Sequence, residues 1–306
     1  MAGNFDLAVV GAGICGLAHA LAAAKRGKKV VVIDRDAQTN GASIRNFGFV
    51  TVTGQQAGEC WTRAMRSRDI WAEVAGPAGI EILHRGLVVA ARRAEAAAVL
   101  EAFLETEMGA QCELLGPAEA KARFPYLKDV TAALYSPHEI RVESRTAIPL
   151  LARWLAEAYG VTVLRGRSVR TVEPPRIETS EGTVTADAAV VCPGDDLVSL
   201  FPERLAPFAL TRCKLHMLRL APIRGRIDAA VMSDLGLVRY LGYAELPAAA
   251  ALLRVLEAEQ REHLASGVHL IVVQSADGSL VVGDFASLRH DAGPLRARKR
   301  GRADPR

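Results

Sequence analysis

Cysteine is scarce in this chain and follows no spacing that would bind a metal. The five cysteines among 306 residues are scattered, with no C-x-x-C pair and no paired Cys/His spacing. This pattern argues against both a zinc site and a disulfide framework, and it fits a reducing compartment. Residues 1–6 also lack the basic segment that opens a secretory signal, so we expect a cytoplasmic protein.

Runs without charge are short, with one exception. Leu7 to Ala24 has eighteen residues without a formal charge and could mimic a membrane span. It contains three glycines and His19, so we interpret it as a strand, a turn and a helix. We therefore expect no membrane span.

A net positive charge is missing from most of the chain, although the whole carries +4. Residues 285–306 hold seven cations and two anions, which leaves residues 1–284 at −1. A protein that binds nucleic acid through its surface needs a basic patch. We therefore predict no nucleic-acid partner for the main part of the chain.

A glycine-rich turn lies between a predicted strand and a predicted helix near the N-terminus. Phe5 to Val10 is an apolar strand that leads into the sequence GAGICG at residues 11–16. A helical pattern follows from Ile14 to Arg26, and a second apolar strand, Val30 to Ile33, ends at Asp34. Strand, glycine turn, helix, strand and acid in this order predict a dinucleotide-binding βαβ unit.

Each residue type in this motif has a physical role. Gly11 permits the tight turn, Gly13 lets the backbone approach a pyrophosphate, and Gly16 lets the helix pack closely on the strand. The helix N-terminus at Ile14 presents N–H groups and the positive end of the helix dipole to phosphates. Asp34 is expected to accept hydrogen bonds from a ribose diol, which disfavours the 2′-phosphate of NADP.

The choice between NAD and FAD depends on the second half of the chain. A predicted hairpin with its turn at residues 180–182 leads into an apolar strand, residues 186–191, that delivers Gly194 back to the nucleotide fold. No second G-x-G-x-x-G occurs, so one dinucleotide is expected. This favours FAD held alone, with electrons passing to oxygen or another acceptor; an NAD-dependent dehydrogenase is the alternative.

These residues resemble the FAD-dependent amine oxidoreductases of the D-amino-acid oxidase and glycine oxidase group. The resemblance runs from Asp6 to about Asp284 and includes GAGICG with Asp34, the loop GASIRNFG at residues 41–48, and the run VVCPG that ends at Gly194. The loop ASIRNFGFV is most similar to a bacterial subgroup placed in aminophosphonate breakdown. The resemblance implies an α/β fold in which a Rossmann-like FAD-binding domain is interleaved with an α+β substrate domain built on a mixed sheet.

The resemblance also implies which residues contact the cofactor, held without a covalent bond because residues 41–49 contain no His or Cys. Ser43, Arg45 and Asn46 would lie along the flavin, although a polar turn is the alternative reading of this loop. Val169 would meet the adenine through its backbone. The complete set assigned to FAD is Gly11, Gly13, Ile14, Gly16, Asp34, Arg35, Ser43, Arg45, Asn46, Val169 and Gly194.

For the substrate, the resemblance implies a small primary or secondary amine, an amino acid or an aminophosphonate, oxidised to an imine by hydride transfer to flavin N5. A cation is needed for the acid group of such a substrate. The residues we assign to the catalytic site are Arg45, Arg239, Tyr240 and His216, with Lys214 as a further cation and Tyr243 as a further wall. Arg45 and Arg239 would form a pair if the ligand is a phosphonate.

The chain length predicts roughly two domains. We expect residues 1–78 and 140–206 to form the FAD-binding domain, and residues 79–139 and 207–284 to form the substrate domain. The patterns of four segments predict two strands around a turn in Gly79–Val89, a helix over Leu197–Phe201 capped by Asp195 and Asp196, a strand over Val238–Tyr243, and one helix over Ala248–Ala265.

Residues 285–306 depart from the family pattern. This basic segment is dense in Arg, Gly, Ala and Pro, a composition typical of GC-rich DNA read out of frame. We interpret it as an aberrant tail produced by a frameshift in a truncated family member. The alternative to an active enzyme is therefore a catalytically impaired, FAD-binding remnant.

Overall fold

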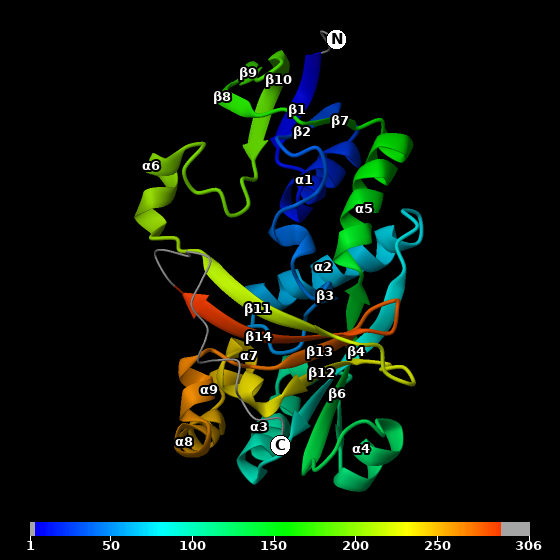
Figure 1. Ribbon diagram of the computed structural model, residues 1–306, viewed down its shortest axis with the longest axis vertical. Helices are drawn as coiled ribbons and strands as arrows, with labels where there is room; N and C mark the ends of the chain where they lie inside the picture. The colour runs from blue at the N-terminus through cyan, green and yellow to red at the C-terminus, as the bar shows by residue number, and fades with distance from the viewer. Residues whose placement is uncertain (1–3, 289–306) are drawn as a thin grey trace.

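Two β-sheets, one toward each end of an elongated molecule, organise the chain (Figure 1). The computed structural model describes residues 4–288. The first sheet has six strands in the order β7-β2-β1-β10-β9-β8, in which β7, β2, β1 and β10 are parallel. Its strands are β1 (Asn4–Val10), β2 (Val30–Asp34), β7 (Thr162–Arg165), β8 (Val169–Glu173), β9 (Arg176–Thr179) and β10 (Gly182–Val191).

Helices α1 (Ile14–Ala24) and α5 (Ser144–Tyr159) pack together on one face of this sheet. Leu17, Val32 and Leu155 are among the fully buried side chains of the cluster between them. The predicted strand–turn–helix–strand unit is thus confirmed, and the uncharged stretch from residue 7 to 24 forms β1 and α1. No helix within residues 4–288 is both long and apolar enough to cross a membrane.

The second sheet has eight strands and is mixed, in the order β11-β14-β13-β12-β4-β6-β3, with β5 paired to β6. Within residues 4–288, β12 and β4 pair in parallel, and the other strand pairs of this sheet are antiparallel. Its strands are β3 (Phe49–Val50), β4 (Ile82–Ala91), β5 (Glu113–Leu115), β6 (Ala132–Val142), β11 (Cys213–Leu220), β12 (Ala230–Ser233), β13 (Ile271–Gln274) and β14 (Leu280–Leu288). The predicted α/β fold with a mixed sheet is confirmed.

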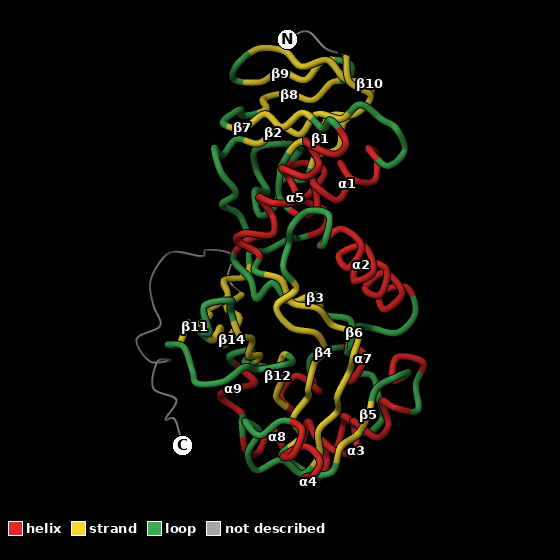
Figure 2. The backbone as a smooth tube through the Cα atoms, turned by 90° about the vertical axis from the view of Figure 1, so that its right-hand side faces the viewer, coloured by secondary structure: helices red, strands yellow, loops and turns green. Residues whose placement is uncertain are grey.

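Helices cover this second sheet and bury its apolar side (Figure 2). Phe103, Tyr243 and Leu252 are completely buried in that cluster, against Leu87 and Val89 of β4. The helices over this cluster are α3 (Ala94–Leu104), α7 (Leu241–Ala244), α8 (Ala249–Glu259) and α9 (Arg261–Ala265). A separate cluster joins α4 (Pro117–Arg123) to Val88 and Ala133 of the same sheet. Helix α2 (Glu59–Ala75) lies against β6 and β3, and α6 (Pro202–Leu205) lies in the connection between the sheets. Short 3₁₀ segments are η1 (Ala42–Ile44), η2 (Glu107–Gly109), η3 (Ala206–Phe208) and η4 (Asp234–Val238).

The strand expected over Val238–Tyr243 is wrong. This segment lies in η4, a short link and α7, because its apolar residues turn inward at helical spacing instead of alternating across a sheet. The N–H of Gly242 donates to the carbonyl oxygen of Gly54 at 2.9 Å. The Tyr243 ring then packs against Phe103 with ring centroids 4.7 Å apart.

Three other expectations need correction. Gly79–Val89 holds one strand, β4, with a pairing irregularity around Gly86, whose φ of +83° bends the strand without a turn. Ala248–Ala265 is broken into α8 and α9 at Gln260, where φ is −131°. Leu197–Phe201 is not helical, since the chain forms bends there and α6 begins only at Pro202.

The predicted tail begins at residue 285, but residues 285–288 continue β14, where the register pairs Leu288 with Cys213 of β11. Residues 289–306 lie outside the described residues, so the frameshift interpretation stays a prediction. The domain boundaries also stay a prediction. The two sheets do alternate along the chain, although β3, within residues 1–78, pairs with β6 of the eight-stranded sheet.

Candidate dinucleotide-binding site

The glycines of the first turn are required by close packing. A Cβ on Gly11 would lie 2.2 Å from the carbonyl oxygen of Cys192, and Gly11 has a φ of +105°. A Cβ on Gly16 would lie 1.8 Å from the carbonyl oxygen of Gly11. Since real Cβ atoms do not approach so closely, only glycine lets β1, α1 and the end of β10 meet here.

The N-terminus of α1 faces open space at the carboxyl ends of β1 and β2. The first N–H groups of a helix have no acceptor within the helix. One of them, from Ile14, donates to Ser43 Oγ at 2.9 Å, which fixes η1 against the glycine turn. Gly13 lies beneath the same hydroxyl, since its Cβ would come within 2.9 Å of Ser43 Oγ.

Asp34 connects the end of β2 to the glycine turn. Its Oδ2 accepts the N–H of Ala12 at 2.6 Å, and its Oδ1 accepts the N–H of Asp36 at 2.8 Å. The sequence predicted a ribose ligand for this carboxylate but not its bond to the glycine turn. Asp34 therefore shapes the turn, and its contact to a ribose stays a prediction.

A cleft with a volume of about 250 Å³ lies between these elements. Seven of the predicted cofactor residues line it: Gly11, Gly13, Asp34, Arg35, Ser43, Val169 and Gly194. Ile14 and Gly16 lie just behind, in the first turn of α1. The structure thus brings together segments from β1, β2, β8 and β10 that are far apart in the sequence.

Arg45 and Asn46 do not line this cleft. The Arg45 Nη2 donates to Asn40 Oδ1 at 2.7 Å. The Asn46 side chain closes its own turn, where Nδ2 donates to the carbonyl oxygen of Ala42 at 2.9 Å and Oδ1 accepts the N–H of Gly48 at 2.7 Å. These contacts agree with the polar-turn reading of the loop, and the flavin contacts of both residues stay a prediction.

Asp196 is a residue of the cleft whose role the sequence did not reveal. Arg35 forms an ion pair with it across the cleft. Asp196 Oδ2 also accepts the Ser199 hydroxyl at 2.6 Å, and Oδ1 accepts the N–H groups of Val198 and Ser199 at 3.2 and 3.0 Å. The bond from the Ser199 hydroxyl, the two N–H groups and Arg35 hold the pKa of this carboxyl well below its usual range. Asp196 thus caps a turn, not the predicted helix.

The residues predicted for the substrate are separated in the structure. His216 and Lys214 lie on β11, at one edge of the eight-stranded sheet. Arg239 lies in a different cavity, between η4, α8 and α9, beside Leu253 and Glu257. Its expected place on a strand of the substrate sheet is therefore wrong.

The two predicted tyrosines also lie among helices. Tyr243 is completely buried, so it cannot be a wall of an open substrate site. The Tyr240 ring packs edge-on against His269, with ring centroids 5.6 Å apart. The substrate roles of Arg239, Tyr240 and His216 stay predictions.

A parallel sheet with a glycine turn, a helix N-terminus and a ribose-end acid defines a dinucleotide-binding protein. The profile of the DAO family, FAD dependent oxidoreductase, matches residues 6–303. The chain belongs to this family. The cofactor of the class is therefore FAD, which favours FAD over the alternative of NAD.

The individual proteins that resemble this chain share low sequence identity with it. The chain is 29% identical over 204 residues to monomeric sarcosine oxidase from Bacillus sp. strain B-0618, covering 63% of this chain and 52% of that protein. It therefore spans about half the length of this curated relative. Among solved structures, glycine oxidase from Geobacillus kaustophilus has a TM-score of 0.68 at 19% identity, covering 93% of this chain and 72% of that one. L-proline dehydrogenase from P. horikoshii has a TM-score of 0.71 at 20% identity, covering 96% and 74%. At these identities, the solved structures show a shared fold.

The residues of the cleft fit the dinucleotide part of FAD. Gly11, Ala12 and Gly13 line the cleft directly before the first turn of α1, and the packing around Gly11 and Gly13 leaves no room for a Cβ. Asp34, Arg35 and Val169 also line the cleft, and their contacts to the ribose and adenine stay a prediction. FAD would thus be held by its pyrophosphate at α1 and by its adenosine between β2, β8 and the end of β10.

Proposed function

We propose that this chain oxidises a small primary or secondary amine that carries an acid group, an amino acid or an aminophosphonate, to the corresponding imine. Oxidation removes a hydride from the carbon beside the nitrogen and a proton from the nitrogen, and a C=N bond forms. The bound flavin supplies the two-electron acceptor for this chemistry. The protein's contribution is to bind and orient the amine.

The observation that carries the proposal is the dinucleotide cleft within a chain that belongs to an FAD-dependent family. The amine class is supported by the relatives, which include a sarcosine oxidase, a glycine oxidase, a proline dehydrogenase and an iminodiacetate oxidase. The substrates named for these proteins share an amine close to a carboxylate. The sequence contains one G-x-G-x-x-G, which supports oxygen or another external electron acceptor over a second nicotinamide.

The experiment is to purify the chain, record its visible spectrum, and add amines without oxygen. We expect a flavin absorption band that bleaches with at least one acidic amine from a panel of glycine, sarcosine and 2-aminoethylphosphonate. Re-admission of air then tests oxygen as the acceptor. A flavin band that no amine bleaches would favour the impaired remnant, and protein without FAD after reconstitution would contradict the proposal.

A further inference from the structure

A cavity with a volume of about 530 Å³ lies between η4, α8 and α9, and we call it the α8–α9 cavity. It shares no lining residue with the dinucleotide cleft. Helices α8 and α9 lie at the end of the molecule away from α1 and the glycine turn (Figure 1). The α8–α9 cavity is therefore a second place where a small molecule has room, and the dinucleotide does not fill it.

The hollow shape follows from a break in the helical chain. Helix α8 ends at Glu259, and Gln260, with a φ of −131°, separates it from α9. After α9, Gly267 has a φ of +65°, and the N–H of Val268 donates to the carbonyl oxygen of His263 at 2.9 Å. The chain thus turns twice within ten residues, and Val268 closes one end of the cavity.

The floor and walls of the cavity are apolar. Leu235, Val238 and Leu264 pack against the buried core cluster of the second sheet and also line the cavity. Leu253, which follows the fully buried Leu252 on α8, lines it with a side chain that is 40% exposed. A single exposed leucine needs no explanation, but apolar side chains from η4, α8 and α9 that line one concavity are typical of a ligand site.

The charged side chains of the cavity are two arginines and one glutamate. Arg239 follows η4, Arg261 begins α9, and Glu257 lies on α8. All three residues are exposed, and none forms an ion pair or a side-chain hydrogen bond with another residue of the described range 4–288. The lining therefore carries a net charge of +1 beside an apolar surface.

Two further carboxylates at the edges of η4 and α8 do not cancel this charge, because Arg93 already pairs with both. Arg93 Nη1 lies 2.8 Å from Asp234 Oδ2, and its Nε lies 2.8 Å from Glu259 Oε2. Asp234 is the first residue of η4, and Glu259 is the last residue of α8. The cavity arginines are thus left to act on whatever enters.

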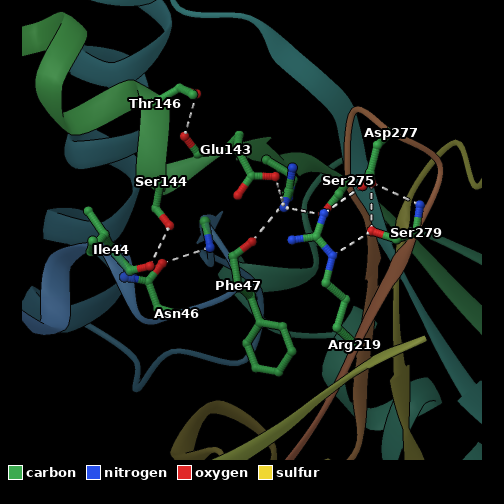
Figure 3. A network of polar contacts seen from close by, with 12 residues as sticks. Ile44, Asn46, Phe47, Glu143, Ser144, Thr146, Arg219, Ser275, Asp277 and Ser279 are labelled. Atoms are coloured by element: carbon green, nitrogen blue, oxygen red, sulfur yellow. Dashed lines mark hydrogen bonds and ion pairs between the residues drawn. The ribbon is translucent and has the colours of Figure 1, made fainter. Parts of the chain in front are cut away.

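Arg219 on β11 shows the contrast with an arginine that is already engaged. Its Nε donates to Ser279 Oγ at 2.9 Å, and its Nη2 contacts Asp277 Oδ2 at 2.7 Å (Figure 3). Its guanidinium is held by a turn of the protein itself. Arg239 and Arg261 have no such partner among the described residues, so their donors are available to an anion.

We propose that the α8–α9 cavity binds a small organic acid with an apolar body, such as a medium-chain carboxylate. The apolar chain would pack on Leu253, Leu264 and Val268, and the carboxylate would meet Arg239 or Arg261. The volume lies in the range of small-molecule sites, which is about 300–1,000 Å³. This inference goes beyond the proposed function and does not depend on it.

The first test is calorimetric titration of the FAD-saturated full chain with decanoate, below the concentration at which decanoate forms micelles. Saturation with FAD keeps the dinucleotide cleft filled. We expect a saturable site, and we expect 1-decanol, which has the same chain length and no charge, to bind about tenfold more weakly. No binding of decanoate to the wild type, or equal binding of the alcohol, would overturn the proposal.

Variants then locate the site. Arg239→Met combined with Arg261→Met should raise the Kd for decanoate about tenfold or more, whereas Arg254→Met, at an exposed arginine of α8 outside the cavity, should leave it unchanged. Leu253→Gln should also raise the Kd about tenfold. Its matched control is Leu270→Gln, because Leu270 is likewise 40% exposed and does not line the cavity.

The remaining outcomes distinguish this site from other ways of holding decanoate. Circular dichroism checks that each variant folds, and these surface positions allow the Leu253 pair and the arginine set to be tested separately. Equal effects of Leu253→Gln and Leu270→Gln would show general adhesion to apolar surface and overturn the site. Sedimentation of the same samples tests a second copy as the occupant: binding of decanoate only when a dimer dissociates would also overturn it.

Discussion

Arg35 and Asp196 are 161 residues apart in the sequence and form an ion pair across the dinucleotide cleft. Arg35 directly follows β2, and Asp196 lies shortly beyond the end of β10. The hydrogen bond to Asp196 raises the pKa of Arg35 despite an opposing effect of burial. The pair thus joins the ends of β2 and β10 where they line the cleft.

Asp196→Asn should weaken FAD binding. The amide keeps the size of the side chain but loses the charge that pairs with Arg35, so the segment at residues 196–199 is held less firmly. We expect the Kd for FAD to rise about tenfold, and fluorescence titration of the reconstituted protein measures it. Asp187→Asn is a matched control, because Asp187 on β10 is exposed and does not line the cleft. Equal effects in the two variants would contradict this role of the ion pair.

Asp196 should also make the stability of the folded protein depend on pH in the acid range. Because the pKa of Asp196 is lowered in the folded state, its contribution is present above the unfolded value of about 3.9 and is lost as pH falls below it. Wild type should therefore lose more stability than Asp196→Asn between pH 5 and pH 3. Urea unfolding at a series of pH values in this range measures the difference. Parallel losses in the two proteins would contradict this.

Gly13→Ala tests whether the glycine turn needs the space it has. The added Cβ would lie 2.9 Å from Ser43 Oγ, so the hydroxyl must move and its bond to the Ile14 N–H must lengthen. We expect loss of most bound FAD with little change in Tm of the apoprotein. Gly76→Ala is the control, since a Cβ there meets nothing within 4 Å and Gly76 does not line the cleft. FAD content at the wild-type level in Gly13→Ala would show that the turn tolerates a side chain.

The sequence alone predicted β1, α1 and β2 because their signals are local. Apolar strands, a glycine turn and a helical period lie within consecutive residues, and their ends agree with the structure within two residues. The contacts that complete the site are long-range: Ser43 with Ile14, and Arg35 with Asp196. No local pattern encodes which polar side chain reaches a given N–H group, so these pairs could not be predicted.

The prediction of a strand over Val238–Tyr243 was wrong for a related reason. Its spacing of apolar and aromatic residues is compatible with a strand, and tertiary packing decides between strand and helix. The deciding contact is that of Gly242, where a Cβ would lie 2.3 Å from the carbonyl oxygen of Gln55. This close approach of backbones requires the chain to turn into α7, which directs Tyr243 inward.

Tyr243 should therefore matter for stability and not for substrate. Its hydroxyl is buried and has no hydrogen-bond partner within residues 4–288, so Tyr243→Phe should leave the free energy of unfolding unchanged or raise it. Tyr243→Ala removes the ring packed on Phe103 and should cost about 3–5 kcal/mol. Urea unfolding measures both. If Tyr243→Phe changed KM for an amine while its stability was unaltered, Tyr243 would contact substrate after all.

The buried His84 predicts a second pH dependence of stability, this time from a group that is positive when protonated. Its pKa is about 4 in the folded protein, whereas a histidine in the unfolded chain has a pKa of about 6.5. Between these values the unfolded chain binds a proton that the folded protein does not, so stability falls as pH falls from about 6.5 toward 4. The slope from this one group is at most about 1.4 kcal/mol per pH unit.

His84→Leu should remove that slope. Leucine fills a similar volume and carries no nitrogen that lacks a partner, so the variant should lose less stability than wild type between pH 7 and pH 5. Urea midpoints at several pH values measure the difference, and His263→Gln on α9 is the control. The difference between variant and wild type isolates His84 from the other groups that titrate in this range. If His84→Leu kept the full wild-type slope, the folded protein would have to bind a proton at His84, which would contradict a lowered pKa for this buried histidine.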